Sequence, residues 1–324
     1  MRSRGLVKLG AALLATLVLG YLVSRQLKLS DLAQLWRAAD LRLLGLGFLG
    51  YGLANVLRAH RFRALTGDRI PTLMLLRMVL IQNFLNTFLP FRAGEVSYLV
   101  MVHRTGAVKP GENLASLLGA RLLDLVAALL IPLAVLPMSR AWSAQDRPLG
   151  WFVAIAAIGV AVPALGVWRA APVAGWLTKR AEASSGLWAR GLTTGGEALL
   201  ALAELRRGHR LGRVALLTAG CWVLLYLAGY VSLLGVGVSV PFWDGLFAYS
   251  FPMIVSMTPI YMLGGFGVFE GSIGFGLHLV GVPTPIAMAG ALLLHVSELT
   301  FVTALAPLGL RVARNSGAPL ERPS

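Results

Sequence analysis

The sequence has little of what soluble enzymes use for chemistry. It holds a single cysteine, Cys221, which excludes an intrachain disulfide. That residue lies within an apolar run, where a thiol packs as a small hydrophobe. Cysteine clusters and the zinc spacings His-x-x-x-His and His-Glu-x-x-His are absent from the sequence, and so is the phosphate-binding loop Gly-x-x-x-x-Gly-Lys-Ser/Thr. We therefore predict no metal and no cofactor, and we name no catalytic residue.

Charged residues are scarce, and acidic ones most of all. Only 13% of the 324 residues are charged, and 14 Asp and Glu face 29 Lys and Arg, for a net charge of +15. Hydrophobic residues make up 57%, and several runs exceed the roughly 18 apolar residues that span a bilayer. The basic residues lie between these runs, so anionic lipid head groups, not nucleic acid, are the expected partner. The composition predicts an all-α, polytopic integral membrane helix bundle, with 1–324 a single membrane domain and 1–320 its helical bundle.

The apolar runs predict about seven to eight spans and one interfacial helix. The interfacial helix is Leu29–Ala39, which has leucines on one side and charges elsewhere. Leu6–Val23 follows basic residues, as in a signal peptide, but it is long and lacks a clear small-x-small cleavage site, so we expect an uncleaved helix. The other apolar segments are Leu41–Leu57, Thr72–Leu89, Val96–Val102, Asn113–Pro137, Trp151–Trp168, Val214–Val236, Phe242–Met262, Gly271–Val280 and Ile286–Leu310.

Basic segments between the spans predict the topology. Residues 169–213 carry eight Lys and Arg against three Glu, which indicates a cytoplasmic basic connecting segment near lipid. The cluster Arg58–Arg63 and the segment His103–Lys109 also belong on the cytoplasmic side by this rule. We expect a multi-pass protein of a bacterial or archaeal cytoplasmic membrane, with both termini cytoplasmic and the loop Arg140–Arg147 outside.

One apolar stretch, Thr258–Glu270, is interrupted by a helix breaker, three glycines and a carboxylate. Pro259 cannot donate a backbone hydrogen bond, and glycines weaken a continuous helix. Inside lipid such backbone survives only where protein covers it or where it lines a watery cavity. Glu270 is therefore expected to face a cavity. The alternative is an ordinary kinked helix in which Glu270 pairs with a basic neighbour. The glycines are Gly264, Gly265 and Gly267.

An earlier stretch, Asn83–Glu95, has the same character, with Pro90, Gly94 and Glu95 in order. If the basic segments that flank 72–103 both lie inside, this part of the chain must enter the membrane and return. Paired interruptions in two halves of a membrane protein indicate a transport site between inverted repeats. We therefore predict two opposed hairpins, re-entrant or made of broken helices, that meet at the middle of the bilayer.

Two pairs of polar residues lie at depth in predicted spans. Arg121 and Asp124 are three positions apart and can share a helix face, which lowers the cost of burying either. A structural ion pair and a role in a transport pathway are both open at this point. His295 and Glu298 have the same spacing in the last span.

Both interrupted stretches carry residues found together in one protein family. The residues are Asn83, Leu89, Pro90, Arg92, Gly94, Glu95, Arg121, Asp124, Pro259, Gly264, Gly265, Gly267, Val268 and Glu270. On these the chain resembles, over nearly its whole length, the lysylphosphatidylglycerol synthase transmembrane-region family, also called the flippase-like domain. The resemblance implies a polytopic membrane protein; some members are fused to an aminoacyl-transferase, whereas stand-alone members look like translocators of lipids or polyprenyl-linked sugars. The family often has arginines where this chain has Tyr98 and Phe269, which puts a phosphate-clamping role at those two positions in doubt.

The leading hypothesis is a translocator of an anionic phospholipid or polyprenyl-linked lipid, without enzyme activity. Arginines would attract the phosphate and carboxylates would set the local charge. The candidate substrate-binding residues are Asn83, Arg92, Glu95, Arg121, Asp124, Gly264, Gly265, Gly267, Glu270 and Glu298. One alternative is a membrane enzyme that modifies a lipid head group with Glu95 or Glu270 as general base. Another is a non-catalytic membrane partner of a lipid-synthesis enzyme.

Overall fold

A computed structural model describes residues 29–89, 92–143, 168–205, 210–257 and 263–313, with a few further positions between 154 and 166. These residues form helices and short 3-10 turns, and no strand occurs among them. This confirms the predicted all-α membrane bundle. The predicted first helix Leu6–Val23, most of Trp151–Trp168, and the prolines Pro90 and Pro259 lie outside the described residues.

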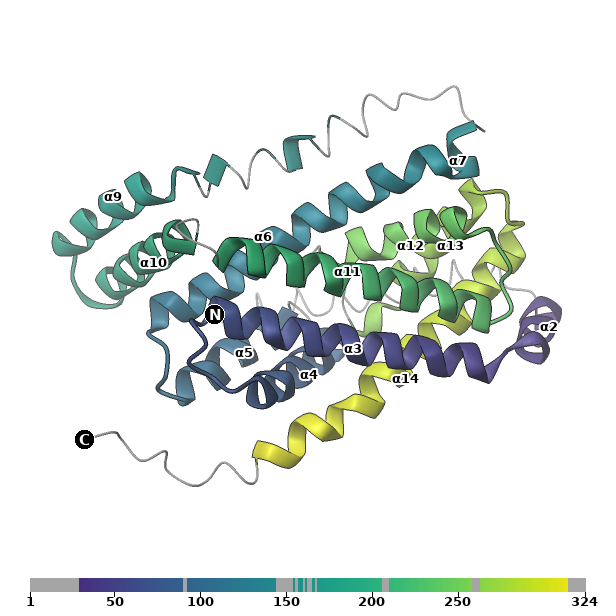
Figure 1. The fold of residues 1–324 in the computed structure, drawn as a ribbon, viewed down its shortest axis with the longest axis horizontal. Coiled ribbons are helices and arrows are strands. Elements are labelled where there is room, and N and C mark those ends of the chain that lie inside the picture. The colour runs from purple at the N-terminus through teal and green to yellow at the C-terminus, as the bar shows by residue number, and fades with distance from the viewer. Residues whose placement is uncertain are drawn as a thin grey trace, which may run out of the picture.

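Two antiparallel helices, α3 (Leu41–Leu65) and α11 (Arg210–Gly235), pack against each other along their lengths (Figure 1). Small residues let the two backbones approach closely, as is common between membrane helices. The facing residues are Gly47 with Ser232, Gly50 with Ala228, and Gly220 with Leu57. The predicted span Leu41–Leu57 is too short, because α3 continues to Leu65 and carries its arginines along the bundle.

Three described helices are long and apolar enough to cross a bilayer: Pro110–Met138, Arg210–Gly235 and Thr284–Leu310. The first combines α6 (Pro110–Val135) with the 3-10 turn η2 (Leu136–Met138), and the last belongs to α14 (Thr284–Ala313). A short helix, α7 (Arg140–Ser143), follows η2. These helices match the predicted spans Asn113–Pro137, Val214–Val236 and Ile286–Leu310.

The first interrupted stretch forms a helical hairpin. α4 (Thr72–Phe88) ends two residues before Pro90, and α5 (Ala93–Arg104) starts three residues after it and packs back on α4. Gly94 makes the close packing possible, because a Cβ atom there would overlap the carbonyl oxygen of Gln82. Each arm is too short to span a bilayer alone, since spanning takes about 20 residues.

The second interrupted stretch forms a similar hairpin. α12 (Phe242–Ser256) and α13 (Val268–Leu279) pack side by side, with the 3-10 turn η3 (Leu263–Gly265) at the tip. The tip has left-handed backbone, with φ of 80° at Gly264, 77° at Gly265 and 80° at Gly267. Only glycine adopts such angles at little cost, so the glycines cause the predicted break.

The two hairpins enter the bundle from opposite ends (Figure 1). The end of α3 lies beside the start of α11, because the two helices are antiparallel. α4 follows the end of α3, and α12 follows the end of α11, so the two hairpins begin at opposite ends of this helix pair. The tip η3 contacts α4, so the hairpins meet inside the bundle. The predicted opposed arrangement of broken-helix hairpins is therefore present.

Peripheral helices cover the sides of the bundle. α9 (Ala170–Glu182) and α10 (Gly186–Leu205) form a helical pair that packs on α6, and α2 (Leu29–Ala38) packs on α14. The connection between α3 and α4, the end of α5 and the start of α11 lie at the same end of the bundle as the α9–α10 pair (Figure 1). The basic segments predicted to share one side of the membrane thus gather at one end, and the assignment of that end to the cytoplasm stays a prediction.

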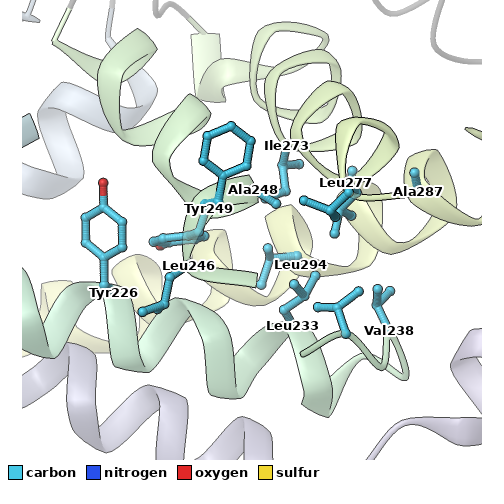
Figure 2. Packing of buried hydrophobic residues seen from close by; sticks show 14 of the residues in the cluster. Tyr226, Leu233, Val238, Leu246, Ala248, Tyr249, Ile273, Leu277, Ala287 and Leu294 are labelled. Atoms are coloured by element: carbon cyan, nitrogen blue, oxygen red, sulfur yellow. The ribbon is translucent and has the colours of Figure 1, made fainter. Parts of the chain in front are cut away.

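The main hydrophobic core lies between α11, α12, α13 and α14 (Figure 2). Fully buried Leu233, Ile273, Leu277 and Leu294 interdigitate there. Cys221 is free and buried, as predicted for a small hydrophobe. This core fixes α12 and α14, the two helices that form one wall of the site described next.

Candidate functional site

A cavity of about 200 Å³ with both polar and apolar side chains in its walls lies between the two hairpins and is lined by α3, α4, α6, α11, α12 and α14. Arginines dominate its charged lining, and these come from three different parts of the chain. The lining residues with polar side chains include Tyr51, Arg58, Arg61, Gln82, Asn83, Asn86, Thr87, Arg92, Arg121, Asp124, Tyr249, Ser256 and Glu298. Among the described residues, the first interrupted stretch lines this cavity through Asn83, Asn86, Thr87 and Arg92, whereas the second hairpin contributes α12, the helix just before its interrupted stretch.

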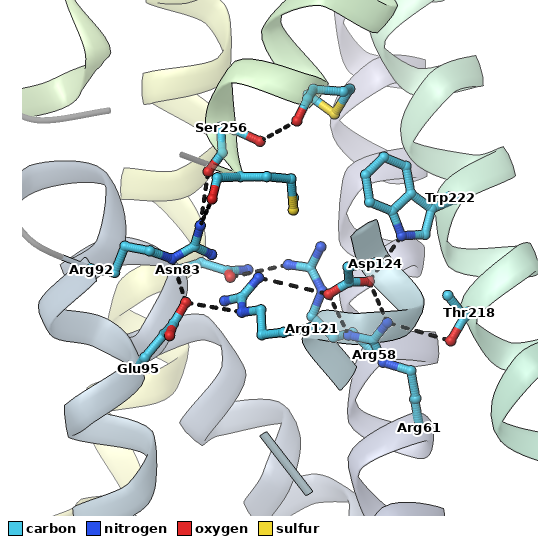
Figure 3. A network of polar contacts seen from close by, with 12 residues as sticks. Arg58, Arg61, Asn83, Arg92, Glu95, Arg121, Asp124, Thr218, Trp222 and Ser256 are labelled. Carbon is cyan, nitrogen blue, oxygen red and sulfur yellow. Dashed lines mark hydrogen bonds and ion pairs between the residues drawn. The ribbon is translucent and has the colours of Figure 1, made fainter. Parts of the chain in front are cut away.

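The most buried charged side chains of the cavity lining form the ion pair Arg61–Asp124. Nη1 and Nη2 of Arg61 donate to the two carboxylate oxygens of Asp124 at 2.5 and 3.1 Å (Figure 3). Trp222 Nε1 donates to the same carboxylate at 2.9 Å, and Thr218 lies 3.4 Å from the guanidinium. A buried charge is tolerated when it is paired and hydrogen-bonded in this way.

Arg121 and Glu95 form the next pair toward the first hairpin. Arg121 Nε lies 2.9 Å from Glu95 Oε1, and its Nη1 lies 3.7 Å from Asp124. The predicted Arg121–Asp124 contact is present, but the bidentate partner of Asp124 is Arg61. Glu95 also accepts a hydrogen bond from Arg92, so two guanidinium groups share this carboxylate.

Arg92 connects the two hairpins. Its Nη1 donates to the carbonyl oxygens of Ser256 and Met257 at 3.0 and 3.1 Å, at the C-terminal end of α12 (Figure 3). The last carbonyls of a helix carry a partial negative charge and favour a cation. Arg92 itself has a φ of 55°, a left-handed angle that residues other than glycine rarely adopt.

Arg58 lies one turn before Arg61 on α3 and faces the same cavity. Its Nη1 donates to Asn83 Oδ1 at 3.0 Å. The Asn83 amide nitrogen donates in turn to Asn55 Oδ1 at 2.6 Å, and Asn55 donates to the Tyr51 carbonyl at 2.9 Å. This chain of neutral amides fixes the orientation of Asn83 and, through it, of the guanidinium.

Glu298 lies in the cavity wall on α14 and accepts a hydrogen bond from the Tyr249 hydroxyl at 2.6 Å. Gly229 on α11 leaves room for the Tyr249 ring, because a Cβ atom there would overlap it. His295, three residues before Glu298, contacts Glu270 at 2.8 Å. One turn of α14 places His295 toward the hydrophobic core and Glu298 toward the cavity.

Glu270 does not line the cavity, which corrects the expectation that it faces one. Only 1% of the residue is exposed, and its Oε1 lies 2.8 Å from His295 Nδ1. Its Oε2 accepts the backbone N–H of Gly267 at 2.7 Å and thereby caps α13. Phe269 stacks on the His295 ring with centroids 4.5 Å apart. The alternative stated from the sequence, that Glu270 pairs with a basic neighbour, therefore describes this contact with His295.

The glycines of the late stretch also act through the backbone. Gly264, Gly265 and Gly267 form the hairpin tip and are not among the residues that line the cavity.

Position 98, where an arginine was expected from the resemblance, holds a buried tyrosine whose ring packs on Phe62 with centroids 4.4 Å apart. Aromatic packing thus occupies both positions where this chain departs from the expected arginines.

Two arginines of the cavity, Arg58 and Arg61, were missed in the sequence because they belong to a basic cluster that ends an apolar run. Their spacing from each other and from Asn55 contained a signal, since residues three apart share a helix face. The described residues contain no group of three or more His, Cys, Asp or Glu side chains that could hold a metal ion.

Comparison with known proteins gives one family match. The model of a family described as the lysylphosphatidylglycerol synthase TM region matches residues 7–306. Searches of curated proteins and of solved structures give no significant match. The match spans both hairpins and every residue of the cavity.

Proposed function

The chain belongs to the lysylphosphatidylglycerol synthase transmembrane-region family, and we propose that it translocates an anionic lipid across the bilayer. The lipid is a phospholipid or a polyprenyl-linked lipid, and its head group passes through the arginine-lined cavity between the opposed hairpins. The candidate residues Asn83, Arg92, Arg121 and Glu298 line this passage. The membrane is the cytoplasmic one, and no nucleic acid takes part.

One observation carries this proposal: four arginines line a single cavity within a membrane bundle. Ionisable residues at membrane depth are costly and mark pathways of substrates or ions. Guanidinium groups bind phosphate through two parallel hydrogen bonds, so an arginine-lined cavity favours a phosphate-bearing head group. Opposed hairpins that meet inside the bundle favour a site with alternating access, as in transporters built from inverted repeats.

Glu270 is a poor candidate for the general base of a head-group-modifying enzyme, since it is buried against His295. Glu95, the other carboxylate considered, is held by Arg92 and Arg121. These contacts favour translocation over head-group chemistry.

Reconstitution into vesicles tests the proposal. Fluorescent phosphatidylglycerol placed in one leaflet should reach the other faster than in protein-free vesicles. Arg121→Ala should slow this movement by about tenfold or more, because it removes one of the four positive charges of the cavity lining, and interactions with a charged group contribute ~1.5–3 kcal/mol. Arg180→Ala is the matched control, since Arg180 lies exposed on α9 and stacks over Trp176. Movement equal to that in empty vesicles would overturn translocation, and a chemically altered lipid would favour the enzyme.

A further inference from the structure

Arg58 differs from the other arginines of the cavity in having no carboxylate partner among the described residues. Its Nη1 donates to the neutral amide oxygen of Asn83 at 3.0 Å. The other three cavity arginines each make an ion pair with Asp124 or Glu95: Arg61, Arg92 and Arg121. These three guanidinium groups share two carboxylates, whereas Arg58 forms no ion pair among the described residues.

The surroundings of Arg58 hold it in place without neutralising it. The amide oxygen of Asn83 accepts a hydrogen bond from the Arg58 guanidinium, and the amide nitrogen of Asn83 donates one to Asn55. A guanidinium has five N–H donors, and Asn83 takes one of them. Arg58 is half-buried and lines the cavity, so its remaining donors are open to a ligand there. An oxyanion is the ligand that suits this fork of donors.

We propose that Arg58 is the phosphate ligand of the cavity and that it binds a single phosphate group of a lipid head group. The proposal rests on the proposed function, because it takes the cavity to receive a lipid. It goes further by assigning the position at which the phosphate is held. Arg61, Arg92 and Arg121 then shape the potential around this position and keep their own partners.

The charge count favours one phosphate with one negative charge. Four arginines of the cavity face three carboxylates, which leaves one positive charge in excess. The three carboxylates are Asp124, Glu95 and Glu298. Residues 90–91 and 258–262, which lie outside the described residues, include no charged side chain. A phosphodiester supplies one negative charge and balances the excess, whereas a pyrophosphate brings more than the cavity compensates.

The size of the cavity points to a head group and not to a whole lipid. Its volume of about 200 Å³ is below the roughly 300–1,000 Å³ of pockets that enclose drug-sized ligands. The acyl chains therefore remain outside the cavity, and a phosphate with a small polar substituent fits within it.

Lipid binding by the purified full-length protein tests the assignment. Native mass spectrometry would measure the affinity for phosphatidylglycerol, diacylglycerol, a polyprenyl pyrophosphate and inorganic phosphate. Arg58→Gln keeps a polar side chain but removes the charge, and we expect phosphatidylglycerol to bind about 10- to 100-fold more weakly. Arg63→Gln is the matched control, because Arg63 lies on the same helix and pairs at the surface with Asp68. Its binding should equal that of the parent.

Arg58→Lys keeps the charge and loses the bidentate geometry, so an intermediate affinity is expected. This variant also serves if Arg58→Gln does not fold. Unchanged binding in Arg58→Lys and Arg58→Gln would overturn the assignment. If inorganic phosphate binds as tightly as phosphatidylglycerol, the claim that the bound phosphate belongs to a lipid is overturned. If the polyprenyl pyrophosphate binds more tightly than phosphatidylglycerol, the claim that the site holds a single phosphate group is overturned. If the parent binds through Arg58 but moves no lipid, the assignment stands and translocation fails.

Discussion

Arg92 donates a hydrogen bond to the carbonyl oxygen of Ser256 at 3.0 Å, joining two residues 164 positions apart. The contact links the break in the first hairpin to the end of α12 in the second. Arg92 adopts left-handed backbone to make it, and a non-glycine residue is held at such an angle only where its surroundings enforce it. One side chain therefore couples the two hairpins at the cavity.

Removing this link should loosen the end of α12. In Arg92→Gln, backbone amides near residue 256 should exchange with deuterium about tenfold faster, because losing a charge-assisted bond costs ~1.5–3 kcal/mol of local opening free energy. Arg104→Gln, an exposed change on α5, should leave that exchange unchanged. Equal exchange in Arg92→Gln and the parent would show that the contact does not hold the hairpins together.

The buried pair Arg61–Asp124 should be the most stability-sensitive charge in the cavity. Asp124→Ala strands a buried guanidinium, and we expect the free energy of unfolding to fall by about 3–5 kcal/mol. Asp68→Ala removes an exposed ion pair with Arg63 and Arg213 and should cost about 1 kcal/mol or less. Thermal melting in detergent at matched expression compares the two. Equal melting temperatures would mean that the pair is not buried in the membrane-embedded protein.

The hairpins could be predicted from the sequence because their causes are local. Glycine and proline change the backbone at their own positions, so Gly264 to Gly267 and Pro90 mark interruptions wherever the chain folds. That the two hairpins enter the bundle from opposite ends could also be predicted, because basic segments indicate which ends of the spans lie on the same side of the membrane. These features needed no knowledge of long-range contacts.

The cavity could be predicted only in part because its partners are distant in sequence. Asp124 pairs with Arg61, which lies 63 positions earlier, whereas the sequence indicates only its neighbour Arg121. Glu270 and Glu298 were expected in one polar region, and the helices turn them to different partners. Helix rotation is set by side-chain packing, which a pattern of polar positions along one helix does not specify.

Gly94 should be essential for closing the first hairpin. A Cβ atom there would overlap the Gln82 carbonyl oxygen and the Asn86 side chain, so Gly94→Ala must push α5 away from α4. Overpacking of this kind costs about 1–3 kcal/mol. Gly52→Ala on α3 is the matched control, since a Cβ atom there meets nothing within 4 Å. A melting temperature that falls for Gly94→Ala and not for Gly52→Ala is expected, and the reverse order would contradict the packing.

Labelling of single cysteines tests the predicted topology. In a Cys221→Ser background, Arg190→Cys on α10 should react with a membrane-impermeant maleimide only from the cytoplasm, and Trp142→Cys on α7 only from outside. Both positions are exposed, and the helices that carry them, α10 and α7, lie at opposite ends of the bundle (Figure 1). Reaction of both from the same side would overturn the topology.

Glu270 should act as a structural residue of the second hairpin and not as a ligand of the head group. Its carboxylate holds His295 and caps α13 at Gly267, so Glu270→Ala leaves two buried polar groups without a partner. Each such group costs about 1–3 kcal/mol, and the melting temperature should fall clearly. His295→Ala removes the same contact from the other side.

A double-mutant cycle separates this pairing from a role in the cavity. If the two side chains act through their contact, the double variant should lose less stability than the sum of Glu270→Ala and His295→Ala. Binding of phosphatidylglycerol by the folded fraction should stay close to that of the parent, since Glu270 does not line the cavity. Loss of lipid binding with an unchanged melting temperature would instead place the Glu270 carboxylate on the path of the head group.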